Sequence, residues 1–193
     1  MGRPGLKPGW GRYALPGGFD SHSLPPRLSL RRPRQARSAQ LEVAVTTIRG
    51  FDFPDELFYL LEHDAWVRLD TDGNATTGMT SLGAHISGEF IEFMAKPVGT
   101  FVDRERALGM LEMSKVIRSA RSPICGVIAD VNEGARADPK LINSDPYGQG
   151  WLARLRPTAW EEDTRLLVTG AAIPAAVEAY MALLSETFGE APP

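Results

Sequence analysis

The sequence predicts a mainly β domain that ends in a helix. Many short apolar runs are separated by closely spaced turns, which is the pattern of a small β sandwich or barrel. Near the end of the chain, apolar side chains recur at helical spacing behind Pro174, a residue that suits the first turn of a helix. This stripe consists of Val177, Tyr180, Met181, Leu184 and Phe188. Because the stripe occupies one face only, we expect the helix to cover the β core.

Composition limits the class of protein. With 193 residues, the chain is long enough for one domain with a hydrophobic core plus extensions. No apolar run approaches the roughly 20 residues that span a bilayer, so no membrane association is expected. The single cysteine, Cys125, rules out an internal disulfide and fits a reducing compartment. We expect the cytoplasm, with an organelle matrix as the alternative. The three histidines lie far apart in the sequence, so no metal site is indicated.

The charge is unevenly distributed along the chain. Residues 1–40 contain eight Lys or Arg residues and one acidic residue, Asp20. Of the chain's 21 basic and 24 acidic residues, 13 and 23 therefore follow residue 40, which gives that part a formal charge of −10. An acidic domain argues against nucleic acid as its partner and favours proteins with basic docking surfaces.

The N-terminal residues 1–44 are rich in Pro, Gly and Arg and show no helical or strand periodicity. Such a segment buries too little apolar surface to offset the entropy of ordering it, so we expect a disordered basic tail. A transit peptide, or translation from a start upstream of the true one, are the alternatives. The folded domain is then expected to comprise residues 45–193.

The first half of the domain reads as short strands. Residues 65–69 and 75–80 predict two strands joined by a hairpin turn at Asp72-Gly73-Asn74. Residues 81–87 fit one or two helical turns, and residues 89–94 predict the next strand.

The most informative stretch runs from Ala107 to Ile128. It reads as two short apolar strands that meet at the polar turn Glu112-Met113-Ser114-Lys115. The pair Ser122-Pro123 breaks the apolar run, and Gly126 opens the next strand. A lysine at the tip of such a hairpin holds its amine in water, where another protein can handle it, although most surface lysines are simply solvated.

The remaining chain is predicted to contain a long polar connection after Val131. Residues 143–150 are rich in turn pairs, and residues 151–157 predict the last strand before the C-terminal helix. The sequence contains no constellation of general acid, general base and nucleophile, so no catalytic residue is predicted.

The hairpin resembles the lipoyl-attachment hairpin of the glycine cleavage H proteins. Those proteins carry a Glu before the modified Lys, a Ser/Ala-Pro pair after it, and then a Gly that opens an apolar strand. Here Glu112 stands three residues before Lys115, and Ser122-Pro123 and Gly126 follow in the same register.

The resemblance extends from about Pro54 to Pro157. Trp66-Val67-Arg68 is similar to the Trp-Val-Arg strand of H proteins. A longer and more specific motif follows, similar to Asn-x-Asp-Pro-Tyr-Gly-x-Gly-Trp in that family. It runs here from Asn143 to Trp151, and Arg154-Leu155-Arg156-Pro157 follows it.

The resemblance implies a fold and a role. The fold is a barrel-sandwich hybrid of the lipoyl/biotinyl type, with short helices and a C-terminal helix. The role is that of a carrier without turnover of its own: a lipoyl group is amide-linked to Lys115, and Glu112 takes part in recognition of the attachment motif. The implied cargo is an aminomethyl group, passed between partner enzymes by thiol–disulfide chemistry. The implied partners are a lipoate ligase or a lipoyl/octanoyl transferase, glycine decarboxylase, aminomethyltransferase and dihydrolipoamide dehydrogenase.

Several positions depart from the H-protein pattern. Ala65 and Ser119 stand where the family often has carboxylates close to its cationic cargo, and Glu105 stands where a Gly is common. These departures resemble the lipoate-binding proteins of the heterodisulfide-reductase-like sulfur-oxidation system, which carry sulfur intermediates. That system, with its heterodisulfide-reductase-like complex as partner, is the alternative function.

Two further alternatives are weaker. A biotinyl hairpin normally has Met on both sides of its lysine, where Ser114 and Val116 stand here. An interaction module that has lost its modification would not require Lys115.

Overall fold

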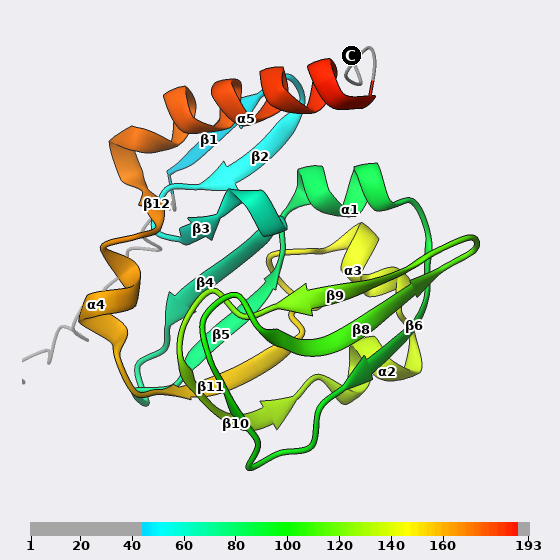
Figure 1. Ribbon diagram of the computed structural model, residues 1–193, viewed down its shortest axis with the longest axis vertical. Helices are drawn as coiled ribbons and strands as arrows, with labels where there is room; N and C mark the ends of the chain where they lie inside the picture. The colour runs from blue at the N-terminus through cyan, green and yellow to red at the C-terminus, as the bar shows by residue number, and fades with distance from the viewer. Residues whose placement is uncertain (1–43, 189–193) are drawn as a thin grey trace, which may run out of the picture. The chain divides into compact units, whose positions relative to one another are not determined.

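The computed structural model describes residues 44–188, with the side chains of 44–186 (Figure 1). The expected tail, apart from Ala44, and the side chain of Phe188 therefore lie outside the described residues. The described strands fall into a seven-stranded, a three-stranded and a two-stranded sheet.

The seven-stranded sheet has the order β12-β3-β4-β5-β11-β10-β7, and every neighbouring pair is antiparallel. Its strands are β3 (Phe58–Leu60), β4 (Ala65–Leu69), β5 (Ala75–Met79), β7 (Phe101–Val102), β10 (Gly126–Val131), β11 (Ala153–Pro157) and β12 (Val168–Thr169).

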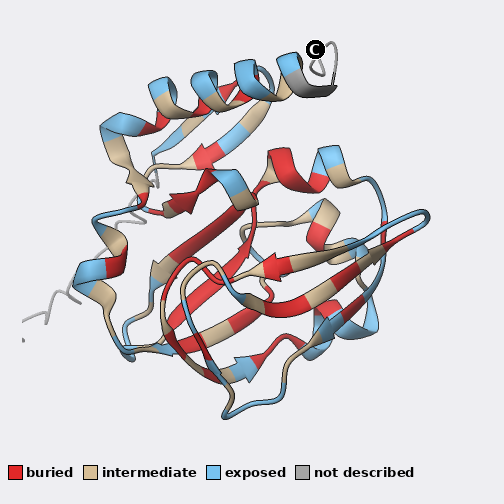
Figure 2. Cartoon of the chain, viewed as in Figure 1, coloured by how far each residue is buried: buried red, intermediate tan, exposed pale blue. Residues whose placement is uncertain are grey.

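The three-stranded sheet packs over the larger one and carries the predicted hairpin (Figure 1). Its order is β6-β8-β9, with strands β6 (Phe90–Ala95), β8 (Ala107–Met113) and β9 (Ile117–Arg121). Side chains from both sheets form the larger hydrophobic core, as the buried stretches along the facing strands show (Figure 2). Members that are fully buried include Val67, Leu108, Leu111, Ile128 and Leu155.

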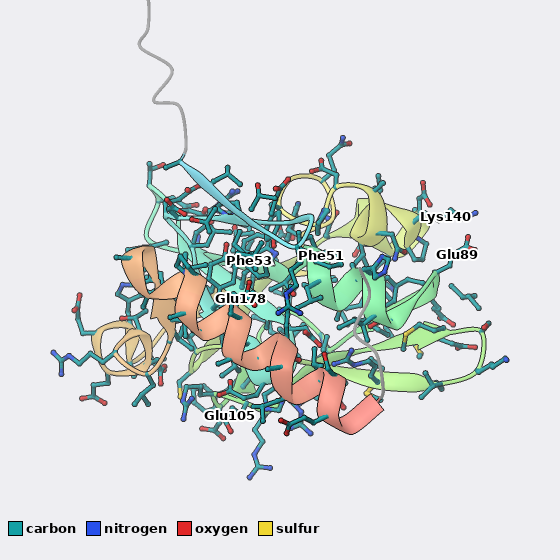
Figure 3. All side chains as sticks on the ribbon, turned by 90° about the horizontal axis from the view of Figure 1, so that it is seen from above. Phe51, Phe53, Glu89, Glu105, Lys140 and Glu178 are labelled. Carbon is teal, nitrogen blue, oxygen red and sulfur yellow. The ribbon has the colours of Figure 1, made fainter. Side chains whose placement is uncertain are left out.

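A second hydrophobic core lies on the other face of β4. The two-stranded sheet of β1 (Val45–Ile48) and β2 (Phe51–Pro54) packs there together with helix α5 (Ile173–Phe188). Figure 3 looks onto α5 and labels Phe51 and Phe53 of β2. The core includes Phe53, Trp66, Leu82, Val177 and Met181, all 3% exposed or less.

Short helices connect the strands. They are η1 (Leu61–His63), α1 (Ser81–Ser87), α2 (Glu133–Ala137), α3 (Lys140–Ser144), α4 (Trp160–Thr164) and η2 (Gly170–Ala172). The Thr80 side chain caps α1 by accepting a hydrogen bond from Gly83 N, and Asn132 caps α2 in the same way through Ala135 N.

The prediction of a mainly β domain with short helices and a C-terminal helix is confirmed. Strands 65–69 and 75–80, helix 81–87 and the strand from Gly126 are found within a residue of their expected bounds. In α5, Val177 and Met181 are buried, so this helix does cover a core as expected.

Three predictions were wrong. The polar connection after Val131 contains α2 and α3, whose five residues each are too few to show a helical apolar period. Strand β11 is not the last strand, because β12 pairs with β3 farther along the chain. Finally, Met113 belongs to β8 and not to the turn, since it pairs with Phe90 and is buried with it.

Candidate functional site: the β8–β9 hairpin

Lys115 lies at the tip of the β8–β9 hairpin, exposed to solvent. The backbone N–H of Met113 donates to the carbonyl of Val116 over 2.9 Å, which closes the tip. Ser114 and Val116 on either side of the lysine are exposed too, and Val116 is 56% exposed although it is apolar. The tip therefore presents one primary amine clear of the domain body.

Glu112 is the last but one residue of β8, and it lies opposite Ile117 of β9 and Glu92 of β6. Its side chain is half-buried, and among the described residues no ion-pair partner holds its carboxylate. The expected neighbour of the lysine is thus available to a visiting protein.

The stem of the hairpin is fixed by close packing of backbones. A Cβ on Gly109 would lie 2.8 Å from the carbonyl oxygen of Met94 and 2.9 Å from the ring of Phe93. Only glycine therefore allows β8 to approach β6 at this point. Alternate side chains of β8, among them Leu111 and Met113, point into the core and fix the register of the hairpin.

The residues that end the hairpin have structural roles. The Ser122 hydroxyl donates to the carbonyl of Ile124 over 2.6 Å, and Ser122 is fully buried. Its own carbonyl accepts from Glu105 N at 2.7 Å, where Glu105 adopts the left-handed conformation with φ 62°. A Cβ on Gly126 would lie 2.7 Å from the carbonyl oxygen of Arg156, so this glycine admits the neighbouring strand β11.

A cluster that sequence reasoning missed lies beneath the hairpin. Arg118 of β9 donates from Nη2 to Asp64 Oδ2 and from Nη1 to Ser87 Oγ, both over 2.9 Å. The Tyr180 hydroxyl of α5 donates to the other oxygen of Asp64 over 3.0 Å. Burial, followed by the charge of Asp64, raises the pKa of Tyr180 above its ordinary value, so the hydroxyl keeps its proton. These four residues come from distant parts of the sequence, and none follows a motif that would reveal their contact.

The two positions that lack the expected carboxylates differ in their surroundings. Ala65 is 5% exposed and belongs to the core between the sheets, so a carboxylate there would be buried among apolar side chains. Ser119 is half-buried and its hydroxyl contacts Met110 Sδ at 3.6 Å. The carboxylate nearest in sequence to Ala65 is Asp64, and it is paired with Arg118.

The long motif from Asn143 to Trp151 acts as a clamp on the elements beside the hairpin. The Asn143 side-chain amide donates to the carbonyls of Ala84 and Gly88 and accepts from Phe90 N at the start of β6. Asn143 thereby fixes the connection between α1 and β6.

The middle of this motif secures the second core. The Tyr147 hydroxyl donates to the carbonyl of Asp52 over 2.6 Å and accepts from Ser81 N over 3.1 Å. Trp66 Nε1 donates to the carbonyls of Met79 and Pro146. Tyr147 and the carbonyl of Pro146 therefore have structural roles in this motif.

Other chemical groups of the described chain offer no competing site. Within residues 44–186, no three His, Cys, Asp or Glu side chains stand close enough to hold a metal ion. Burial raises the pKa of the Cys125 thiol, which also contacts Asp163, so this thiol keeps its proton and is a poor nucleophile. An open groove of about 560 Å³ beside Trp151 is lined by Asp70, Asp72 and Arg154, whose charges bind one another.

A sandwich of hairpins that exposes a single lysine at one hairpin tip is the arrangement of a carrier domain for a covalently bound group. The model of the family described as glycine cleavage H-protein matches residues 57–180, which is most of the described chain. The chain belongs to the glycine cleavage H-protein family. Members of this family are lipoyl carriers that bear lipoate covalently on a lysine, and they are not enzymes.

Individual relatives agree with the family model. Glycine cleavage system H protein 2 of Aquifex aeolicus is 36% identical over 126 residues, which are 65% of this chain and 78% of the relative. Glycine cleavage system H protein of Psychrobacter cryohalolentis is 34% identical over 106 residues, covering 55% and 83%. The crystal structure of a glycine cleavage system H protein from Mycobacterium marinum superposes with a TM-score of 0.57 at 29% identity, over 66% of this chain and 99% of that one.

The resemblance to H proteins and the expected fold are thus confirmed. The sulfur-oxidation alternative gains no support over glycine cleavage from these relatives. Within residues 44–188, no helix is both long enough and apolar enough to cross a bilayer.

Proposed function

We propose that Lys115 is the lipoyl-attachment residue of this carrier and that the chain serves glycine cleavage. The observation that carries this proposal is the position of Lys115 at an exposed hairpin tip inside the segment that matches the family. A lipoyl group on Nζ fits the site, because the amine is in solvent and amide formation places no charge or bulk against the core. Lys115 would hold the group, which would supply a disulfide whose bond opens as one sulfur takes the aminomethyl group and the other a proton. Dihydrolipoamide dehydrogenase would reoxidise the dithiol that remains after the cargo leaves.

The residues of the chain itself hold and present this group. The β8–β9 ladder keeps the tip at a fixed distance from the body, and Glu112 offers a recognition point beside the lysine. A tethered group reaches an effective concentration of about millimolar at a docked site, which is the benefit of a carrier over a free cofactor.

The partners that we propose follow from this role. A lipoate ligase or lipoyl/octanoyl transferase modifies Lys115, and glycine decarboxylase, aminomethyltransferase and dihydrolipoamide dehydrogenase then use the carrier. The formal charge of −10 after residue 40 suits partners with basic docking surfaces. A reducing compartment such as the cytoplasm suits a chain with one cysteine.

The domain boundaries are part of the proposal. Residues 45–193 form the carrier domain, since β1 begins at Val45, and residues 1–44 are an appended basic segment.

Mass spectrometry tests the attachment residue. The full chain is produced in a host that lipoylates its own proteins, and the intact mass and the peptide that carries Lys115 are measured. We expect one lipoyl group on this peptide and none on the peptides that contain Lys96 or Lys140. The variant Lys115→Arg, which keeps the charge and blocks acylation, should remain unmodified. Biotin on the Lys115 peptide, or lipoyl on another lysine of the wild type, would refute the assignment.

A further inference from the structure

The cluster beneath the hairpin connects β9, which follows the Lys115 tip, to α1, to α5 and to Asp64 between η1 and β4. Asp64 is buried, and the other three residues are half-buried. Arg118 stands three residues after Lys115 and lies opposite Leu111, which is fully buried. Because directly opposite residues project from the same face of an antiparallel pair, the Arg118 side chain projects from the inner face of the hairpin. It reaches Ser87, the last residue of α1, and Asp64, which separates η1 from β4. Asp64 in turn accepts from Tyr180 of α5.

The acceptor of this cluster is held rigidly. Asp64 adopts the left-handed conformation with φ 54°, its N–H donates to the carbonyl of Leu61, and its carbonyl accepts from Thr80 N. Its side chain packs against Gly83, where an added Cβ would collide with the Asp64 side chain. The residue is 3% exposed. Asp64 is therefore a fixed anchor for the guanidinium.

Electrostatics favours the ion pair between Arg118 and Asp64 in the folded domain. A buried carboxylate is strongly unfavourable unless a positive charge and hydrogen bonds compensate it. Arg118 is the cation of the described chain that forms an ion pair with Asp64, and both carboxylate oxygens are occupied by Arg118 and Tyr180. The side chain of Arg118 is accordingly bound to the body of the folded domain.

The position of the contact gives it a consequence for the tip. Beyond Arg118, the hairpin contains only the pair Glu112 and Ile117 and the closing bond between Met113 and Val116. Arg118 is thus the outermost point at which β9 is attached to α1, to Asp64 between η1 and β4 and, through Asp64, to α5. We propose that Arg118, with Asp64 and Tyr180, is a positioning latch that sets the direction of the hairpin and so presents Lys115 to the enzyme that acylates it. This inference rests on Lys115 as the attachment residue.

Arginine is required because its planar fork addresses two acceptors at once. Nη1 and Nη2 bind Ser87 and Asp64, which belong to different elements. A lysine offers a single compact cation and satisfies one of the two.

The test compares variants of the full chain as substrates of a lipoate ligase. The variants are Arg118→Ala, Arg118→Lys and Tyr180→Phe, and the control is Arg49→Gln. The control breaks the 2.7 Å ion pair between Arg49 and Glu178, which ties α5 to the β1–β2 turn without touching the hairpin. KM and kcat for acylation are measured, together with hydrogen exchange of the backbone amides at residues 113–117.

If Arg118 acts as a latch, its loss should change KM for acylation much more than kcat. Arg118→Ala should raise KM about tenfold and leave kcat within about a factor of two, since the amine itself is unchanged. Amide exchange at the tip should become faster in the same variant. Arg118→Lys should recover part of both effects, Tyr180→Phe should show a smaller effect of the same kind, and Arg49→Gln should match the wild type.

Other results would overturn the latch. An Arg118→Ala protein with a lower melting temperature but unchanged KM and unchanged exchange at the tip would show a merely structural ion pair. Equal effects of Arg118→Ala and Arg49→Gln would assign the effect to α5 as a whole. If Arg118→Ala does not fold, the double variant Asp64→Asn/Arg118→Gln removes both charges together, and the same criteria apply to it.

The attachment site and the latch fail in different ways. A wild-type chain that is not acylated on Lys115 rejects the attachment site. A wild-type chain that is acylated there, with variants that keep its KM, rejects the latch alone.

Discussion

At the scale of single residues, Glu105 stands where H proteins commonly have a glycine, and its backbone adopts a conformation that favours glycine. This residue has φ 62° in the turn before the hairpin, a conformation that glycine adopts without cost and other residues adopt at about 1–2 kcal/mol. The turn holds it there through Ser122, whose carbonyl accepts from Glu105 N, and Arg121, whose guanidinium donates to the Glu105 carbonyl. The residue thus carries strain that a glycine would not.

Replacement of this residue by glycine should stabilise the domain. We expect Glu105→Gly to raise the free energy of unfolding by about 0.5–1 kcal/mol. Glycine removes the strain of the left-handed conformation from the folded chain, and this gain exceeds the loss of stability caused by the greater entropy of the unfolded chain. The ion pair with Arg104 that is lost is partly exposed and contributes little. Thermal unfolding measures the difference. Glu105→Ala is the control, since it loses the same ion pair and keeps the strain. A glycine variant no more stable than the alanine variant would contradict the explanation.

At the scale of elements, the connection between α1 and β6 depends on one side chain from α3. Asn143 forms hydrogen bonds with the carbonyls of Ala84 and Gly88 and with the N–H of Phe90. Strand β6 is the neighbour of β8, so Asn143 also helps to position the strand on which the β8–β9 hairpin pairs. The nearby exposed pair of Lys140 and Glu89, labelled in Figure 3, adds a surface contact of 2.7 Å between the same elements.

Removal of the half-buried Asn143 side chain should destabilise the domain more than its partial exposure alone would suggest. We expect Asn143→Ala to lower the free energy of unfolding by about 2–3 kcal/mol, because it leaves two acceptors and one donor without this partner. Urea denaturation provides the measurement. As a matched control, Asn74→Ala removes an exposed side-chain bond to Asp72 in a surface turn and should cost well under about 1 kcal/mol. Equal losses in the two variants would argue against a clamp.

At the scale of the whole described domain, two hydrophobic cores lie on opposite faces of the strands β3 to β5. The inner core joins the two larger sheets, and the outer core joins β4 to α5 and the β1–β2 hairpin. Half-buried ionisable groups link the stability of the domain to pH. One such group is His63 of η1, whose pKa is lowered from 6.5 chiefly by burial and then by the charge of Arg121.

The stability of the domain should therefore fall as the pH drops below about 6.5. The folded chain keeps His63 neutral at a pH where the unfolded chain already protonates it, so acid favours the unfolded state in that window. Stability is fully present above the unfolded pKa and declines as the pH falls toward the lower folded pKa. Melting temperatures between pH 7.5 and 5.5 test this. The decline should be smaller in His63→Gln, and an identical decline in both proteins would contradict it.

The sequence by itself determined the mainly β class, the hairpin with Lys115 at its tip and the C-terminal helix. These features depend on local patterns: period-two alternation, turn pairs such as Asp72-Gly73, and an apolar stripe on one helical face. The same local information failed for α2 and α3, which are too short to show a helical period.

Only the tertiary structure decided which distant residues meet. Asp64, Ser87, Arg118 and Tyr180 come together because two sheets and α5 pack around β4, and no local pattern encodes that packing. Tertiary structure likewise decided that Ala65 faces the core, so that the missing carboxylate at this position could not simply be restored. Local patterns fix the direction of the chain over a few residues, whereas contacts across 54 residues, as between Asp64 and Arg118, depend on the register and packing of whole sheets.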